Sequence, residues 1–190
     1  MTGLSPGRVP CEARGAIPLS AILWNELEQA GIPGIHGVWF LETGTHLSIA
    51  VSIKQMYNGH ARQTGMAIAG CAQGAFLNRF VIIVDEDVDV TNEDDLWWAV
   101  ASRCDPATAI DIIPECWSSP LDPLLNPEKR QKGQFTNSKA IIYACKPYHW
   151  IDRFPIVVRT NPELIKNIIR KYGDTLADIS DSDLNFVTHG

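Results

Sequence analysis

The sequence predicts an α/β fold, namely a single three-layer domain with a mixed sheet, a βαβ core and a C-terminal helix. The first observation is an uninterrupted run of apolar, mostly β-branched residues at 80–84, which is too short for a helix and typical of a strand covered on both faces. The second is a polar turn and then a helical pattern that ends before Pro106. The third is a β-prone segment at 108–113, which would complete a βαβ unit.

The turn after the central strand is acidic and leads into a helix. Thr91 and Asp94 match a capping box, so the helix is expected to begin there. Open α/β sheets usually place their ligand crevice at the carboxyl end of such a strand. The acidic residues of the turn are Asp85, Glu86, Asp87 and Asp89. The expected apolar side of the helix consists of Leu96, Trp97, Val100 and Ala101.

The elements before the central strand follow from the apolar periodicity. A helix is expected over 19–30, ended by a glycine and a proline. The β-rich segments 35–41 and 47–53 are expected to form adjacent antiparallel strands. A helix over 61–73 would be rich in glycine, and each interior glycine costs about 1 kcal/mol against alanine. A close neighbour must therefore pack against this helix.

Three segments follow the βαβ unit. Residues 114–137 are rich in proline and predict a long surface excursion, a kind of loop that is usually functional or contacts a partner. Residues 140–144 predict the last strand. A helix over 161–172 starts at an Asn-Pro pair and carries an apolar stripe. The stripe consists of Leu164, Ile165, Ile168 and Ile169.

These elements divide the chain into three parts. Residues 1–18 lack apolar periodicity and predict an irregular lead-in. Residues 19–173 form the α/β domain, and the mostly polar residues 174–190 form a flexible tail.

Composition excludes several classes of function. A formal net charge of -6 without a basic run argues against nucleic acid or an anionic membrane as the main partner. No apolar stretch reaches the roughly 18 residues of a membrane span, and the first residues lack the apolar core of a signal peptide. We therefore expect a cytoplasmic protein whose five widely spaced cysteines are reduced thiols.

The sequence holds no self-contained catalytic or metal-binding motif. Asp85, Asp87 and Asp89 alternate as a calcium loop begins, but Val90 and Leu96 stand where that loop needs glycine and glutamate. We therefore expect a solvated turn there, with no specific calcium or zinc site. The histidines show no ligand spacing, so ordinary hydrogen-bonded or surface histidines are expected. Gly31, Gly34 and Gly37 are spaced GxxGxxG and precede a strand, whereas the glycine fingerprint of dinucleotide-binding folds follows one. A Rossmann-type cofactor site is therefore not expected.

Six stretches, taken in order, carry a family resemblance. They are SAILW at 20–24, AGIPGI at 30–35, VSIK at 51–54 with GHA at 59–61, VDEDVDV at 84–90 with WA at 98–99 and Arg103, SPLDP at 119–123 and ACKP at 144–147. With these stretches the chain resembles the C-terminal third of UbiD-type decarboxylases over about residues 10–173. These enzymes use a prenylated flavin to act on aromatic and α,β-unsaturated carboxylic acids.

The resemblance implies a division of labour. In that family the prenylated FMN, its divalent metal (Mn or Mg), potassium and a Glu-Arg-Glu catalytic set belong to an N-terminal region, so this chain is expected to hold no catalytic residue and to be inactive alone. The C-terminal domain closes over the flavin, and its terminal helix packs on a neighbouring subunit. A homo-oligomer through the 161–172 helix is therefore expected, together with a possible flavin-binding partner subunit.

The resemblance also implies residues that line the substrate pocket. In the family, residues four apart on the segment entering the first helix line the pocket, and here they match Ala13, Ile17 and Ala21. The polar motif that the family often has there appears as EARGA at 12–16. A second candidate for the pocket is the apolar pair Ile113 and Pro114.

Three functions remain open at this point. The first is a domain or subunit of a reversible carboxy-lyase that works only with a flavin-binding half. The second is a non-catalytic oligomerisation or regulatory module derived from such an enzyme. The third is a small-molecule or metal binder at the crevice after the strand at 80–84.

Overall fold

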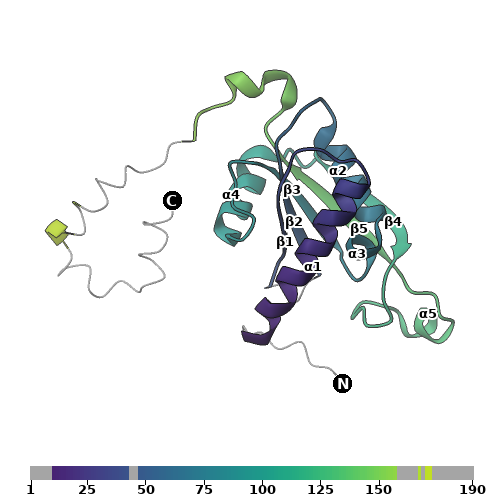
Figure 1. The fold of residues 1–190 in the computed structure, drawn as a ribbon. Coiled ribbons are helices and arrows are strands. Elements are labelled where there is room, and N and C mark those ends of the chain that lie inside the picture. The colour runs from purple at the N-terminus through teal and green to yellow at the C-terminus, as the bar shows by residue number, and fades with distance from the viewer. Residues whose placement is uncertain (1–9, 43–46, 158–166, 168–169, 173–190) are drawn as a thin grey trace. The chain divides into compact units, whose positions relative to one another are not determined.

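A computed structural model describes residues 10–42, 47–157, 167 and 170–172 (Figure 1). The chain divides into two compact units, Met1–Asp152 and Arg153–Gly190, and the fold below belongs to the first. The strands are β1 Ile35–Phe40, β2 Ser48–Ile53, β3 Phe80–Asp85, β4 Ile110–Trp117 and β5 Thr136–Ala144. The helices are α1 Pro10–Gln29, α2 His60–Gly70, α3 Ala72–Ala75, α4 Glu93–Arg103 and α5 Pro127–Gln131, followed by the 3-10 helix η1 Tyr148–Arg153.

The five strands form one mixed sheet in the order β1-β2-β3-β5-β4. The central strand β3 runs parallel to β2 and to β5, whereas β1 and β4 are antiparallel edge strands. The predicted central strand and the antiparallel pair β1–β2 are confirmed. The predicted βαβ partner at 108–113 is wrong, because β4 pairs antiparallel with β5 and β5 occupies the place beside β3. The βαβ core is β2–α2–α3–β3 instead.

The sheet is covered on both faces, which confirms the three-layer prediction. Side chains alternate between the faces of a strand, so neighbouring residues of β2 and β3 belong to different cores. On one face Val51 and Ile83 pack with Leu23 of α1 and Ile68 of α2. On the other face Ala50, Ile82 and Val84 pack with Leu96 and Ala99 of α4.

Helix α1 begins earlier than its periodicity predicted. Residues 10–18, expected to be irregular, are helical and include Pro18. Proline in a helix interior removes one backbone donor and usually costs about 3 kcal/mol. Buried Ala16 and Ser20 continue the buried stripe of Leu23 and Leu27, so packing on the sheet offsets this cost. Residues 1–9, the predicted 174–190 tail and most of the predicted 161–172 helix lie outside the described residues.

The start and the buried side of α4 differ from the prediction. The N-cap is Asn92, whose side-chain oxygen accepts from the Asp94 backbone N–H, whereas the Thr91 hydroxyl donates to Asp89. The buried residues of α4 are Leu96, Ala99 and Arg103, whereas Trp97 and Ala101 are exposed. A hydrophobicity pattern assigns tryptophan to the buried side of a helix and arginine to solvent. Arg103 can be buried because it pairs with the carboxylates of Asp85 and Asp87.

The glycine-rich helix divides at Cys71 into α2 and α3, and close packing against it is confirmed. A Cβ atom on Gly65 would lie 2.5 Å from Cγ2 of Ile141 on β5. A Cβ atom on Gly74 would lie 2.1 Å from the Ile68 carbonyl oxygen. These glycines let the helices approach the sheet and each other. The 114–137 excursion is shorter than predicted, because β4 extends to Trp117, β5 starts at Thr136 and α5 lies between them.

Candidate functional site

A groove of about 370 Å³ lies between the first helix and the first strand of the unit. Figure 1 shows α1 running alongside β1 at the edge of the sheet. The groove is mostly apolar and contains no titratable side chain. Its lining residues are Ile17, Ser20, Ala21, Trp24 and Asn25 from α1, and Val38 and Trp39 from β1.

Two of the predicted pocket residues line this groove. Ile17 and Ala21 are four apart on α1, so they share one helix face. The side chain of Ala13 lies outside the described residues. Ile113 and Pro114 lie on β4, at the opposite edge of the sheet from β1, so the structure does not bring them to the groove.

Sequence reasoning missed the aromatic part of the groove. Trp24 stands three residues after Ala21, so the helical period of the predicted residues could have found it. Val38 and Trp39 could not be found that way, because nothing local to the sequence says which strand lies beside α1. Trp24 is oriented by its Nε1–H, which donates to the Glu28 carboxylate at 2.8 Å.

The groove can bind the apolar part of a ligand but offers no acid or base. Its lining combines two indole rings with small aliphatic side chains, a surface that suits a planar apolar group. The buried hydroxyl of Ser20 has no hydrogen-bond partner. Proton transfer would have to come from groups outside this lining.

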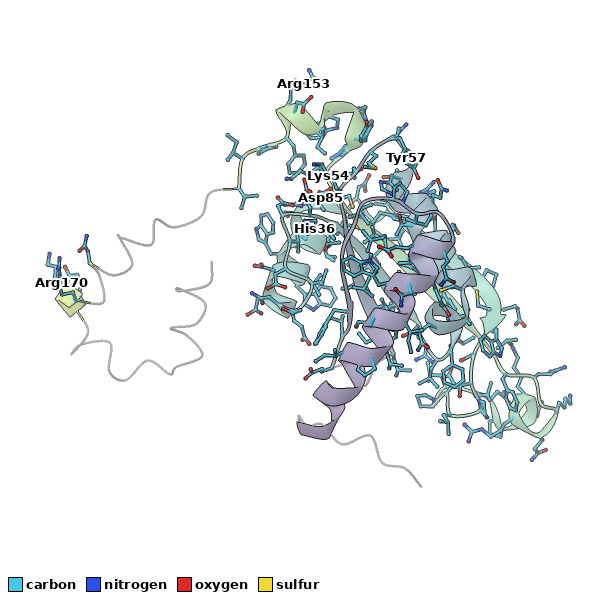
Figure 2. All side chains as sticks on the ribbon, viewed as in Figure 1. His36, Lys54, Tyr57, Asp85, Arg153 and Arg170 are labelled. Carbon is cyan, nitrogen blue, oxygen red and sulfur yellow. The ribbon has the colours of Figure 1, made fainter. Side chains whose placement is uncertain are left out.

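A polar cluster lies at the carboxyl ends of the parallel strands, where Figure 2 labels Asp85 and Lys54. The buried Asp85 carboxylate ends β3 and accepts three hydrogen bonds. Gln55 Nε2 donates to Oδ1 at 2.6 Å, and Arg103 Nη1 and the Lys146 backbone N–H donate to Oδ2 at 3.0 and 2.7 Å. The cluster therefore ties together the ends of β2, β3, β5 and α4.

Asp87 completes the cluster as a second partner of the same arginine. Arg103 reaches Asp87 with both terminal nitrogens, at 2.8 and 2.9 Å, and Lys146 Nζ donates to it at 2.7 Å. Burial acts to raise the pKa of Asp87, but the bonds and charges of Arg103 and Lys146 outweigh it and lower the pKa to about 2. The guanidinium also lies 5.0 Å from the centre of the Trp98 ring.

The expected solvated turn is therefore wrong for Asp85, which is buried and paired. Within the described part of the chain, no group of three or more His, Cys, Asp or Glu side chains is arranged to hold a metal. The carboxylates of Asp85 and Asp87 are bound by arginine and lysine instead. We interpret the cluster as a structural tie rather than a ligand crevice, and the absence of calcium or zinc binding stays a prediction.

Acid should remove part of the stability that Asp87 contributes. Its folded-state pKa of about 2 lies below the ordinary 3.8, so the contribution is complete above about pH 4 and is lost as pH falls toward 2. Because the side chain is 33% exposed, we expect only about 1–2 kcal/mol after solvent screening. Urea unfolding of wild type and Asp87→Asn across this range should show a steeper pH dependence for wild type. Equal slopes would contradict the assignment.

His60, at the start of α2, fits the expectation of ordinary hydrogen-bonded histidines. It is fully buried, its Nδ1 accepts from the Met56 backbone N–H at 3.2 Å, and its ring stacks on Tyr57 with centroids 4.6 Å apart. Burial lowers its pKa, against the raising effect of the carbonyls of Pro33 and Lys54. This histidine supports the chain after β2.

Neither the groove nor the acidic cluster fits a flavin with its phosphate and metal. The groove is apolar, and the acidic cluster is already neutralised by Arg103 and Lys146. A flavin phosphate needs cationic groups or clustered backbone N–H donors, and the groove lining supplies no cationic side chain. We therefore derive no chemical step through such a cofactor on this chain.

Comparison with known families identifies the chain. Residues 14–144 match the family described as 3-octaprenyl-4-hydroxybenzoate carboxy-lyase C-terminal domain, also called UbiD_C. The chain belongs to this family. The expected UbiD resemblance is thereby confirmed, and the match lies within the stretch of about 10–173 that the sequence had indicated.

Relatives of this UbiD-family chain include decarboxylases. It is 40% identical over 117 residues to a phenolic acid decarboxylase of Bacillus subtilis (strain 168). The match covers 62% of this chain and 24% of that protein. It is 34% identical over 112 residues to a phenolic acid decarboxylase of Sedimentibacter hydroxybenzoicus, covering 59% of this chain and 23% of that protein. The chain thus spans about a quarter of the length of the curated relatives that it matches.

Solved structures agree with this assignment. The open form of vanillic acid decarboxylase from Sedimentibacter hydroxybenzoicus matches with a TM-score of 0.63 and 26% identity, over 86% of this chain and 33% of that one. The UbiD-class enzyme HmfF from Pelotomaculum thermopropionicum, in complex with FMN, matches with a TM-score of 0.69. Its 23% identity, over 85% of this chain and 34% of that one, supports the fold alone. Among the described residues, no helix has the length and apolarity needed to span a bilayer.

Proposed function

We propose that this chain is the C-terminal domain or subunit of a UbiD-like carboxy-lyase that reversibly decarboxylates an aromatic or unsaturated carboxylic acid. The observation that carries the proposal is the family match over residues 14–144, together with phenolic acid decarboxylases as relatives. The α1–β1 groove, with Ile17 and Ala21, would bind the apolar body of the acid. This chain would position the substrate and exclude water from it.

The cofactor would be held by a flavin-binding region that corresponds to the part of the relatives beyond this chain's match. Two structures of the relative HmfF are described in complex with FMN and with prFMN, which supports prenylated FMN as the cofactor. A bound prenylated flavin would supply the electron sink for decarboxylation, with the divalent metal and potassium of the resembling family. We propose that the present domain closes over that site and carries no catalytic acid or base.

Filling the groove should impair turnover without unfolding the domain. Ala21 is exposed on α1, so Ala21→Trp should leave the free energy of unfolding unchanged while occupying the space between Ile17 and Trp24. In a mixture with a prenylated-FMN-loaded flavin-binding region from the Bacillus subtilis relative, we expect kcat/KM for a phenolic acid to fall at least about tenfold.

Ile22→Trp is the matched control, because Ile22 is exposed on the same helix but does not line the groove. Its kcat/KM should equal that of wild type. If both variants behave alike, the groove is not the substrate site, and the family assignment stands without it.

Assembly through the predicted 161–172 helix remains a proposal. Light scattering of the purified chain should show a homo-oligomer that Ile168→Asp dissociates, because a buried charge would disrupt an apolar interface. A clean oligomer that stimulates no flavin-binding region would favour the alternative, a non-catalytic oligomerisation or regulatory module.

A further inference from the structure

One polar atom at the α1–β1 groove is left unpaired by the fold. Ser20 lines the groove and is only 7% exposed, and its hydroxyl has no hydrogen-bond partner among the described residues. Its neighbours one turn away on the same side of α1, Ala16 and Leu23, are fully buried and apolar. A hydroxyl in such surroundings destabilises the fold, because it has lost its bonds to water without gaining others.

The fold itself does not require this hydroxyl. Alanine at the same helix position would leave no unsatisfied group and has the highest helix propensity of all residues. The present orientation of the Ser20 side chain is held by no hydrogen bond, only by its preference for staggered torsion angles. Rotation about its Cα–Cβ bond therefore breaks no contact, and the hydroxyl can turn toward a polar group that enters the groove.

The lining of the groove restricts what that group can be. The indole rings of Trp24 and Trp39, beside Ile17, suit a planar aromatic ring. Asn25, the other polar residue of the lining, is exposed, so water already satisfies its amide. No charged side chain belongs to the lining that the structure describes, so an ionised group would lose its hydration without meeting a counter-charge. A neutral hydroxyl both donates and accepts hydrogen bonds, as the Ser20 hydroxyl does.

The same argument gives a bound aromatic acid a direction. Its carboxylate cannot lie at Ser20, because one serine hydroxyl does not replace the water shell of a carboxylate. The carboxylate therefore stays outside the groove, where the proposed flavin-binding region would act on it. A substituent of the ring, and not the reacting group, meets Ser20.

We propose that Ser20 determines specificity by hydrogen-bonding a neutral hydroxyl substituent on an aromatic ring bound in the α1–β1 groove. The ligand class is then a hydroxylated ring rather than a pure hydrocarbon one. As a statement about the substrate this rests on the proposed function, whereas binding of the ring to this chain does not. Ser20 contacts the ring substituent and takes no part in proton transfer.

A cycle of two ligands and two proteins tests the hydrogen bond. p-Cresol and toluene differ only in the ring hydroxyl, and wild type and Ser20→Ala differ only in the serine hydroxyl. Each ligand is titrated into the full nitrogen-15-labelled chain, and Kd is taken from the indole N–H signals of Trp24 and Trp39. Wild type should bind p-cresol about fivefold more tightly than Ser20→Ala does, the effect of one neutral hydrogen bond. Toluene should bind both proteins equally.

Three controls separate recognition from folding. Ser102→Ala makes the same change on α4, outside the groove, and should leave both Kd values unchanged. The melting temperature of Ser20→Ala should equal or exceed that of wild type, because the substitution removes an unsatisfied buried group. p-Toluate carries a carboxylate in place of the hydroxyl of p-cresol. It should bind wild type and Ser20→Ala equally, because its carboxylate stays outside the groove.

Each of the opposite results would overturn the proposal. Equal p-cresol affinities of wild type and Ser20→Ala would show that the hydroxyl recognises no ligand. Indole signals that do not shift up to the solubility limit of p-cresol would show that the groove receives no ring. A lower melting temperature of Ser20→Ala would assign the hydroxyl a structural role.

The binding cycle is independent of turnover, so its failure differs from a failure of the proposed function. Recognition by Ser20 together with a normal kcat/KM for Ala21→Trp would refute the substrate role of the groove and leave the hydrogen bond in place. Loss of turnover in Ala21→Trp without a fivefold effect of Ser20→Ala on p-cresol would do the reverse.

Discussion

Replacing Arg103 with leucine is expected to cost about 3–5 kcal/mol of unfolding free energy, because it leaves the carboxylates of Asp85 and Asp87 without their shared cation. Asp85 is buried, so water cannot replace the guanidinium there. A loss of this size is a large fraction of the 5–15 kcal/mol by which domains are usually stable. Urea unfolding followed by circular dichroism measures it.

Ser102→Ala is the control for this variant, because Ser102 is exposed on the same helix and its hydroxyl donates to the Trp98 carbonyl rather than to the acidic cluster. It should change stability by less than about 0.5 kcal/mol. Adding Asp85→Asn to Arg103→Leu should recover part of the loss, because an amide leaves no buried charge unpaired. An Arg103→Leu protein as stable as wild type would show that the cluster is not a structural tie.

Gly74→Ala is expected to destabilise the domain by about 3 kcal/mol, the upper end of the range for overpacking. The added Cβ would lie 2.1 Å from the Ile68 carbonyl oxygen and 2.9 Å from the Ile68 carbonyl carbon. These are backbone atoms of α2, so no rotamer change relieves the clash, and α3 must move away from α2. The melting temperature should fall by several degrees.

Gly70→Ala is the matched control at the end of α2. A Cβ at Gly70 meets no atom within 4 Å, so alanine should be neutral or should stabilise the helix by about 0.5–1 kcal/mol. Opposite signs for the two substitutions are the expected result. Equal effects would mean that glycine content, and not the close approach of α3 to α2, sets stability here.

The layers of the fold could be predicted because they depend on local periodicity. The apolar run at 80–84, buried from Val81 onward, the helix that follows it and the antiparallel pair β1–β2 all show in the pattern of apolar residues. The place of β4 could not be predicted. β4 pairs with β5 rather than with β3 because β5, which comes later in the chain, takes the place beside β3. No local sequence pattern predicts that placement.

The candidate site was predicted in part. Ile17 and Ala21 came from the family resemblance and do line the groove, whereas Ile113 and Pro114 lie at the other edge of the sheet. The buried ion cluster was missed because Arg103 stands at a helix position that a hydrophobicity pattern assigns to solvent. Burial of Arg103 becomes favourable because the fold brings α4 against Asp85 at the end of β3, where the chain after β5 also donates to the same carboxylate.

Turnover by the purified chain, alone and with a flavin-binding half, tests the central claim most directly. The chain alone, supplied with prenylated FMN, divalent metal and potassium, should release no carbon dioxide from any phenolic acid, because it is proposed to carry no positioned acid or base. Added to a flavin-loaded flavin-binding region of the Bacillus subtilis relative, it should raise turnover at least about tenfold over that region alone. Decarboxylation by the chain alone would contradict the proposed division of labour, and no response from any such region would contradict a catalytic role altogether.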